Sequence, residues 1–170
     1  MRTALWPDRR RPVSLRTRGA VACALLSALA GCSNAVEIDS PDVDDATEAS
    51  CRSFLDALPS ELADQGSVEI SPDDALGAAW GDPAIVVTCG VPMPEEFDRF
   101  SACWETDGVG WFVPDDQIED PRADVTLTTI GYSPNVQIRL PGELRPPDAV
   151  TVEVGAAVKK ILEKSGKGCV

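Results

Sequence analysis

Carboxylates are the side chains with the widest chemical range in this sequence, because its 170 residues include 28 Asp and Glu and no histidine. The missing histidine excludes Ser-His and Cys-His nucleophile pairs and imidazole metal ligands. Two carboxylates flanking a cleft could still hydrolyse a glycosidic bond, one of them as general acid. Acidic residues are frequent along the chain, so we expect a solvated acidic face rather than a catalytic pair. The candidates for such a pair are Glu95, Glu96, Asp98, Glu105, Asp115, Asp116, Glu119 and Asp120.

Other motifs that carry chemistry are missing from the sequence. It contains no phosphate-binding loop, dinucleotide fingerprint, serine elbow or Ser-x-x-Lys pair. Asp42, Asp44 and Asp45 suggest a calcium loop, but the glycine at its sixth position and the glutamate at its twelfth are absent. We therefore predict no enzymatic activity, no catalytic residue, no cofactor and no metal site.

Several of the few aromatic residues sit near glycines and could form a ligand or partner surface. Tryptophan rings on a sheet can bind sugars or peptides, because their flat apolar faces desolvate easily. A domain of this size also needs a few large side chains in its core, so we favour a core role and keep the ligand surface as the alternative. The residues concerned are Trp80, Trp104, Trp111 and Phe112.

The first 31 residues have the pattern of a secretory signal peptide. Residues 1–18 contain six arginines, and residues 19–30 are almost entirely small or apolar. This apolar run is too short for a helix that spans a bilayer.

The end of the apolar run points to a lipid anchor. Leu29-Ala30-Gly31-Cys32 resembles the bacterial lipobox, which implies cleavage before Cys32 and a diacylglycerol on its sulfur. Two acyl chains hold a protein stably on a membrane. We therefore predict a protein anchored through Cys32 on the extracytoplasmic face of the cell membrane. The alternative is an ordinary signal peptide with Cys32 as a disulfide partner.

The charge of residues 32–170 restricts the partners. These residues hold nine basic and 27 acidic side chains, a net charge of −18, whereas the whole chain carries −13. Such a surface disfavours nucleic acids and is repelled by anionic headgroups, so the lipid must provide the membrane attachment. Residues 33–50 hold six acids and no base, which predicts a flexible tether after Cys32.

The other four cysteines, Cys51, Cys89, Cys103 and Cys169, predict two disulfides in an exported domain. Three pairings are possible. We favour Cys89–Cys103, which closes a short loop between strands that could be neighbours, and Cys51–Cys169, which would tie the first helix to the chain end. No Cys-x-x-Cys redox motif or paired zinc knuckle is present.

Residues 51–170 form the predicted single globular domain. Cys51, Phe54, Leu55, Leu58 and Leu62 give the apolar stripe of a helix with Ser50 as its N-cap, which Pro59 must interrupt or end. A capped turn and short helix are expected over residues 71–80, and a last helix over 155–164. Alternating or β-branched runs predict strands at 67–70, 84–89, 101–106, 109–113, 123–130, 135–140 and 150–154.

These elements predict an α+β fold: a mostly antiparallel sheet of about five or six strands, with an N-terminal and a C-terminal helix on one face. A small β-rich sandwich is the alternative.

Several motifs resemble an actinobacterial lipoprotein family known as domain of unknown function 3515. The resemblance covers most of residues 51–154 and implies a small exported, membrane-anchored protein. It implies no known reaction and supplies no catalytic residue. The matching stretches are Cys51, Leu58-Pro59, Ala79-Trp80-Gly81-Asp82-Pro83-Ala84-Ile85, Cys89-Gly90-Val91-Pro92, Cys103 and Gly108-Val109-Gly110-Trp111-Phe112.

Taken together, the sequence predicts a non-catalytic, lipid-anchored module that binds an envelope protein or a cell-wall component. The alternative is a histidine-free, carboxylate-dependent hydrolase of cell-wall glycan.

Overall fold

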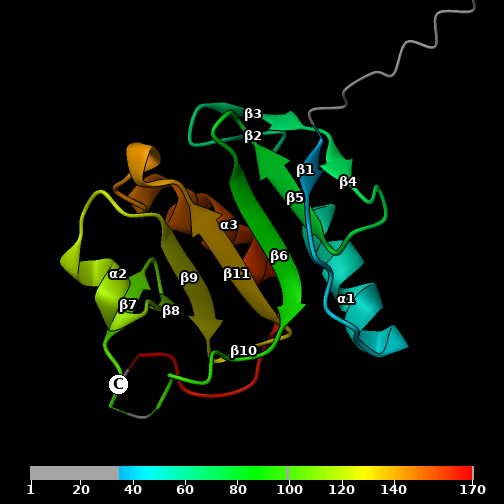
Figure 1. Ribbon diagram of the computed structural model, residues 1–170. Helices are drawn as coiled ribbons and strands as arrows, with labels where there is room; N and C mark the ends of the chain where they lie inside the picture. The colour runs from blue at the N-terminus through cyan, green and yellow to red at the C-terminus, as the bar shows by residue number, and fades with distance from the viewer. Residues whose placement is uncertain (1–34, 99, 170) are drawn as a thin grey trace, which may run out of the picture. The chain divides into compact units, whose positions relative to one another are not determined.

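The computed structural model of the protein describes residues 35–98 and 100–169, which are built around an eight-stranded antiparallel sheet (Figure 1). The strand order is β2-β3-β5-β6-β11-β9-β8-β7. The strands are β2 (Glu61–Leu62), β3 (Gln65–Val68), β5 (Gly77–Trp80), β6 (Ile85–Val91), β7 (Cys103–Thr106), β8 (Val109–Phe112), β9 (Val125–Ile130) and β11 (Asn135–Leu140).

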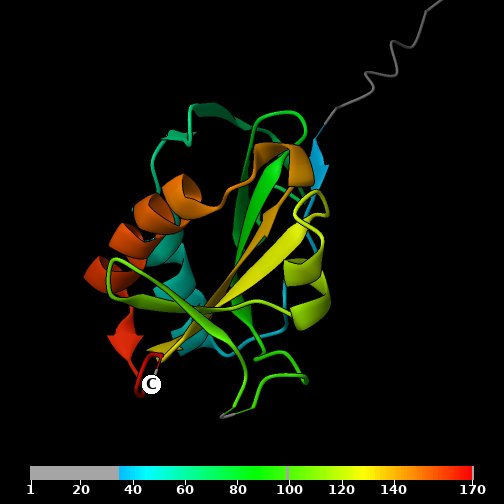
Figure 2. The same ribbon diagram turned by 90° about the vertical axis from the view of Figure 1, so that its left-hand side faces the viewer.

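Two helices, α1 (Asp45–Leu55) and α3 (Asp148–Ile161), cover one face of this sheet (Figure 2). In the described residues, the other face carries short elements, among them β1 (Val36–Glu37) and α2 (Asp115–Glu119), and we call it the open face. The α+β class with both helices on one face is confirmed, with eight strands in place of five or six. Two further pairs of short strands lie outside this sheet: β4 (Ile70–Ser71) pairs with β1, and β10 (Tyr132–Ser133) pairs with β12 (Glu163–Lys164). A 3-10 turn, η1, covers Gly142–Leu144.

The core lies between the sheet and the two helices. Alternate residues of a strand point to opposite faces, so β6 and β11 each bury every second side chain against the helices. Each of these side chains contributes about 1.5–3 kcal/mol through burial. They include Ile85, Val87 and Cys89 of β6, and Val136, Ile138 and Leu140 of β11, packed with Phe54 of α1 and Val154 of α3.

The last helix begins earlier than the sequence pattern predicts. Val150, Val152 and Val154 alternate as in a strand, yet they lie in α3, so the strand predicted at 150–154 is wrong. Val150, Val154 and Val158 are spaced by four residues and are buried on one side of the helix, whereas Val152 is 42% exposed. Burial on a helical face therefore determines the structure of this segment.

The acidic segment predicted as a flexible tether is folded from residue 35 onward. Helix α1 begins at Asp45 rather than near Cys51, and its N-cap Asp44 accepts a hydrogen bond from the Thr47 amide over 2.7 Å. The helix ends at Leu55, before Pro59. Upstream, Ile38 is 4% exposed and packs against the sheet. The tether prediction is therefore wrong for residues 35–50.

Leu62, which the apolar stripe places in the first helix, lies in β2, and the segment 71–80 is also misassigned. Its turn signal predicts a short helix, but Gly77–Trp80 form strand β5, hydrogen-bonded between β3 and β6. Pairing with two neighbouring strands overrides the local signal. The hairpin β7–β8 around Asp107-Gly108 and the central strand β6 are confirmed.

The four cysteines form two disulfides, as predicted, but the favoured pairing is wrong. The bridges are Cys51–Cys89, between α1 and β6, and Cys103–Cys169, between β7 and the C-terminal segment. Strands β11, β9 and β8 separate β6 from β7, which places Cys89 and Cys103 about 19 Å apart across the sheet. A disulfide needs Cα atoms at about 5.5 Å, so the strand order forbids the predicted bridge.

None of the helices in residues 35–98 and 100–169 combines the length and the apolar character needed to cross a membrane.

Candidate functional site

The alternative of an aromatic ligand surface is not formed, because three of its four members are buried. Trp80 is 2% exposed, Trp111 is fully buried and Phe112 is 3% exposed. Trp104 is 40% exposed, although it lies directly opposite Trp111 in the β7–β8 pair. The core interpretation is therefore correct for Trp80, Trp111 and Phe112.

The buried aromatic rings have definite structural roles. Trp80 donates its indole N–H to the carbonyl of Pro59 over 3.0 Å. Phe112 faces away from the helices and packs edge-on against Phe97, with ring centroids 5.4 Å apart. The indole N–H of Trp111 is buried and has no hydrogen-bond partner in residues 35–98 and 100–169.

The candidate carboxylates do not form a desolvated pair. All eight are exposed. Glu96, Asp115 and Asp116 do share the lining of a hollow of about 380 Å³ beside Phe112. A carboxyl that acts as general acid near neutral pH needs a buried, apolar environment, which these exposed residues lack. In the described part of the chain, no group of three His, Cys, Asp or Glu could hold a metal ion. The predicted lipidation site, Cys32, lies outside the described residues.

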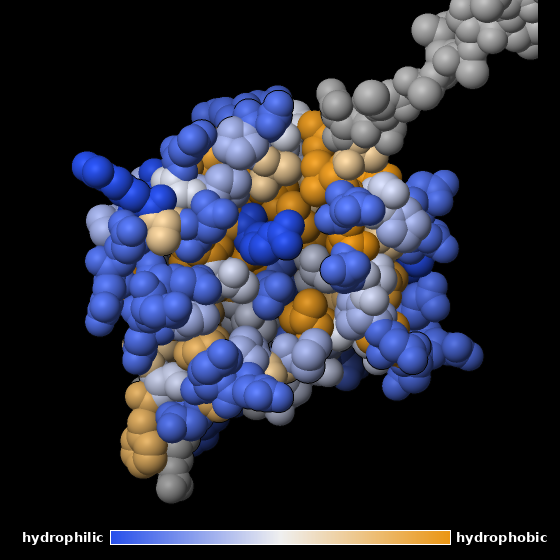
Figure 3. Space-filling view, in the orientation of Figure 1, coloured by the Kyte–Doolittle hydropathy of each residue, from blue (hydrophilic) through white to orange (hydrophobic). Residues whose placement is uncertain are grey.

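The open face of the sheet offers a more defined arrangement. Strand β11 runs through its middle, and Arg139 points away from the helices because its neighbours Ile138 and Leu140 are buried beneath the sheet. Figure 3 views this face and shows strongly hydrophilic and hydrophobic surface side by side near its centre. On this face, Arg139 of β11 lies between Val86 of β6 and Thr126 of β9. Gln137 of β11 lies between Thr88 of β6 and Thr128 of β9.

One wall of the site is a strap, defined here as residues 36–40. Its amides at Val36 and Ile38 donate to the carbonyls of Glu69 and Ser71 over 2.8 and 2.9 Å. Ile38 packs on Ala79 and Val86, directly over β5. A Cβ at Gly77 of β5 would lie 2.9 Å from the Ile38 side chain, so the glycine permits this close approach.

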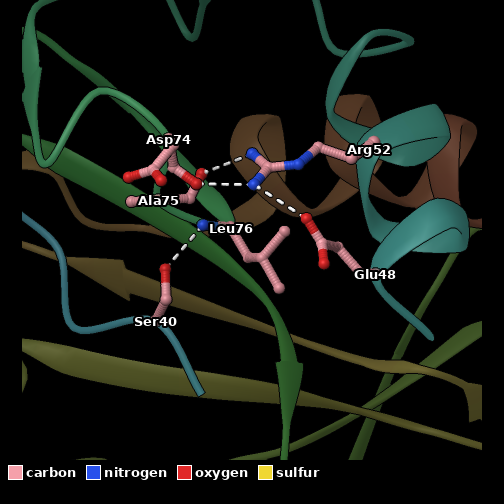
Figure 4. Close-up of polar contacts among 6 residues, drawn as sticks. All are labelled: Ser40, Glu48, Arg52, Asp74, Ala75 and Leu76. Atoms are coloured by element: carbon pink, nitrogen blue, oxygen red, sulfur yellow. Dashed lines mark hydrogen bonds and ion pairs between the residues drawn. The ribbon is translucent and has the colours of Figure 1, made fainter. Parts of the chain in front are cut away.

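The end of the strap is held by a polar cluster that includes α1 (Figure 4). Ser40 Oγ accepts a hydrogen bond from the Leu76 amide over 2.6 Å. On the other side of the same segment, the guanidinium of Arg52 donates to the carbonyls of Asp74 and Ala75 over 2.6 and 3.1 Å. The strap is therefore fixed at Ile38 by apolar packing and at Ser40 by hydrogen bonding.

Two adjoining hollows form a groove on the open face, and both include Val86 and Arg139. The larger hollow, about 620 Å³, lies between the strap and the loops that carry Arg122, Asp124 and Glu143. The smaller, about 260 Å³, lies under Glu37 and Asp39 of the strap and includes Thr88 and Gln137. Arg139 therefore stands where the two hollows meet. We refer to this feature as the open-face groove.

The loop that carries Arg122 is held rigidly by Arg145. Its Nη1 donates to the carbonyls of Gln117, Asp120 and Ala123 over 3.1, 2.9 and 3.1 Å. The Asp120 carboxylate also accepts from the Arg122 amide over 2.9 Å. This network orders the backbone at one end of the groove without using the Arg122 side chain.

The arginines of the described residues fall into two classes. Arg52 and Arg145 each bond to backbone carbonyls of a neighbouring loop. In residues 35–98 and 100–169, the guanidinium groups of Arg122 and Arg139 have no hydrogen bond or ion pair. Both of these exposed groups line the larger hollow, although residues 32–170 carry a net charge of −18. Two guanidinium groups without a direct partner among the described residues thus line one hollow of a strongly acidic protein.

Sequence reasoning did not single out Arg122 or Arg139. A signal was present for Arg139, which alternates with Val136, Ile138 and Leu140 and therefore falls on the solvated side of a predicted strand. Arg122 has no comparable signal, because only the folded loop brings it to the groove.

Comparison with known proteins gives one match. A family model described as a protein of unknown function (DUF3515) matches residues 12–166. No curated protein and no solved structure matches the chain.

Proposed function

Since the chain belongs to the DUF3515 family, which brings no activity with it, we propose from its own residues that it is a lipid-anchored, extracytoplasmic binding module. Cys32 carries the lipid, and the open-face groove binds an envelope component that presents an anionic group. The module acts by binding and not by catalysis.

The lipobox supports the anchor, and the position of the strap determines how far from the membrane the groove would lie. Cys32 precedes Ala35, the first described residue, by three positions. Three residues span at most about 11 Å when fully extended. Val36 already lines the larger hollow. A lipid on Cys32 would therefore hold the groove close to the membrane surface, in place of the long reach that an 18-residue tether would allow.

The observation that carries the binding function is Arg139. Its guanidinium is exposed at the junction of the two hollows and lacks an intramolecular partner among the described residues. A planar guanidinium binds a carboxylate or phosphate through two parallel hydrogen bonds, a stronger contact than a neutral hydrogen bond. Gln137, on the same strand and face, adds a side-chain amide beside it.

The anchor is tested by substitution of Cys32. Cells that express the Cys32→Ser variant should release the protein from the membrane fraction and should not label it with radioactive palmitate. Cys23→Ser, which removes the other cysteine of residues 1–34, is the matched control and should keep both properties. Membrane retention of the Cys32→Ser variant would contradict the anchor.

The binding role is tested by capture from envelope fractions. The purified protein should retain a saturable component, and Arg139→Gln should lower its recovery about tenfold, since loss of a charge-assisted contact costs roughly 1.4 kcal/mol or more. Lys160→Gln removes an exposed cation from α3, on the other side of the sheet, and should leave recovery unchanged. Equal recovery with the two variants would contradict a role for the groove.

A further inference from the structure

The open-face groove holds charges of both signs in a definite order. Glu37 and Asp39 lie at the smaller hollow, and Asp124 and Glu143 at the larger one. Arg139 stands between the two groups, because it lines both hollows. Four carboxylates therefore flank a guanidinium at the centre, and Arg122 adds a second cation at the larger hollow.

This order of charges discriminates among ligands. A simple anion would be attracted to Arg139, but the four carboxylates and the net negative charge of the protein would repel it. A simple cation would be attracted to the rim and repelled at the centre. A ligand that carries an anionic group and a separate cationic group satisfies both parts of the groove.

The uncharged lining favours a ligand with amide groups and small side chains. Gln137 donates from Nε2 to Thr128 Oγ1 over 3.4 Å, which orients the amide and leaves its carbonyl oxygen without a donor among the described residues. Thr88 lies beside it in the smaller hollow. The apolar part of the lining is made of Val36, Pro83, Ala84, Val86 and Pro141.

We propose that the open-face groove binds a short peptide, or an amino-acid derivative, whose carboxylate contacts Arg139 while its free ammonium group lies at the carboxylates of the rim. This inference rests on the proposed binding function and specifies its ligand class. Arg139 sets the specificity for the carboxylate. Glu37 and Asp39 or Asp124 and Glu143 receive the ammonium group, depending on the direction of the peptide.

The test uses trialanine with both termini free, its C-terminal amide and its N-acetyl derivative. Each is titrated into the purified, oxidised, isotope-labelled protein in detergent micelles, and the amide resonances of β6 and β11 are followed. Free trialanine should shift these resonances, and blocking either terminus should weaken binding about tenfold.

Two variants make the assignment specific. In Arg139→Gln the acid and the amide of the peptide should bind equally weakly, because the group that distinguishes them is gone. Lys160→Gln should bind as the unaltered protein does. A preference for the acid that survives in Arg139→Gln would overturn the assignment of the carboxylate to Arg139.

The remaining outcomes separate this inference from the proposed function. Acetate or phosphate that shifts the same resonances as strongly as trialanine would replace the peptide site by a simple anion site. Stronger binding of glycerophosphoethanolamine than of trialanine would assign the groove to a lipid headgroup. If trialanine does not bind at millimolar concentration while envelope capture still depends on Arg139, the ligand class is wrong and the binding function stands. If neither trialanine binding nor envelope capture depends on Arg139, both the ligand class and the proposed binding function are wrong.

Discussion

The backbone amide of Gly142 donates a hydrogen bond of 2.9 Å to Oδ1 of Asp124, and this contact joins the two loops at one end of the open-face groove. The loops touch so closely that a Cβ on Gly142 would lie 1.9 Å from the carbonyl oxygen of Arg122. The absence of a side chain at Gly142 is therefore a condition for the position of Arg122.

We expect Gly142→Ala to separate these two loops. The added methyl group has no room, so the free energy of unfolding should fall by about 1–3 kcal/mol, as in other overpacked sites. The amide resonances of residues 120–124 should shift at the same time. Gly66→Ala is the matched control, because no atom beyond its own residue and its chain neighbours lies within 4 Å of its added Cβ. Urea unfolding that gives the same loss for the two variants would contradict the close contact.

Removal of either disulfide should destabilise the protein. The bridges connect residues 38 and 66 positions apart, and loop closure then accounts for about 4 kcal/mol each. The Cys51→Ala/Cys89→Ala variant should lose more than the Cys103→Ala/Cys169→Ala variant, because both Cys51 and Cys89 are fully buried. Urea unfolding measures the losses. Peptide mapping without reduction should yield Cys51 linked to Cys89, and a Cys89–Cys103 peptide would contradict the strand order.

The two buried tryptophans should respond differently to loss of the indole N–H. Trp80→Phe removes the donor to Pro59 and leaves a carbonyl without its partner, whereas Trp111→Phe removes a buried N–H that has none. Loss of a hydrogen bond typically costs about 0.5–1.5 kcal/mol, so Trp80→Phe should destabilise more than Trp111→Phe by about 1 kcal/mol. Urea unfolding of the two variants checks this order, and a reversed order would contradict it.

The N-cap of α1 should make stability depend on pH. The hydrogen bond from the Thr47 amide is the main reason that the pKa of Asp44 lies below its ordinary value of 3.8. The folded state thus binds this proton less tightly than the unfolded state, and the stabilisation is complete above the ordinary pKa. It is lost as the pH falls through the lowered value of the folded protein.

Asp44→Asn isolates this contribution, because asparagine can cap the helix without titrating. The difference in free energy of unfolding between the original protein and the variant should be constant near neutral pH. In acid, the original protein should lose stability relative to the variant, which denaturation at a series of pH values would measure. A difference independent of pH would show that Asp44 does not bond through its carboxylate.

The sequence predicts elements well where one local pattern determines the structure. Residues 84–89 are continuous and β-branched and form the middle of the sheet, and Asp107-Gly108 between two strands gives the expected hairpin. Residues 150–154 show the limit, because Val150 and Val154 fit a strand and a helix equally well. The helices and the sheet must assemble before burial selects between these two structures.

Features that depend on the order of strands could not be read from the sequence. Cys89 and Cys103 are only 14 positions apart, yet β11, which follows both in the chain, lies between their strands. The groove has the same origin, since Arg139, Arg122 and the strap come from separate parts of the chain. Val36 and Ile38 looked like isolated apolar residues in an acidic linker because their partners, Ile70, Ala79 and Val86, follow much later.

The strap also determines how the domain would respond to a pulling force. Tension on the chain before residue 35 reaches first the bonds of Val36 and Ile38 to Glu69 and Ser71. Rupture of these bonds would strip Ile38 from β5 and open one side of the groove, while the large sheet stayed intact. The Cys51–Cys89 bridge then ties the chain to β6 and stops the extension. Mechanical load would therefore open the groove before it unfolded the domain.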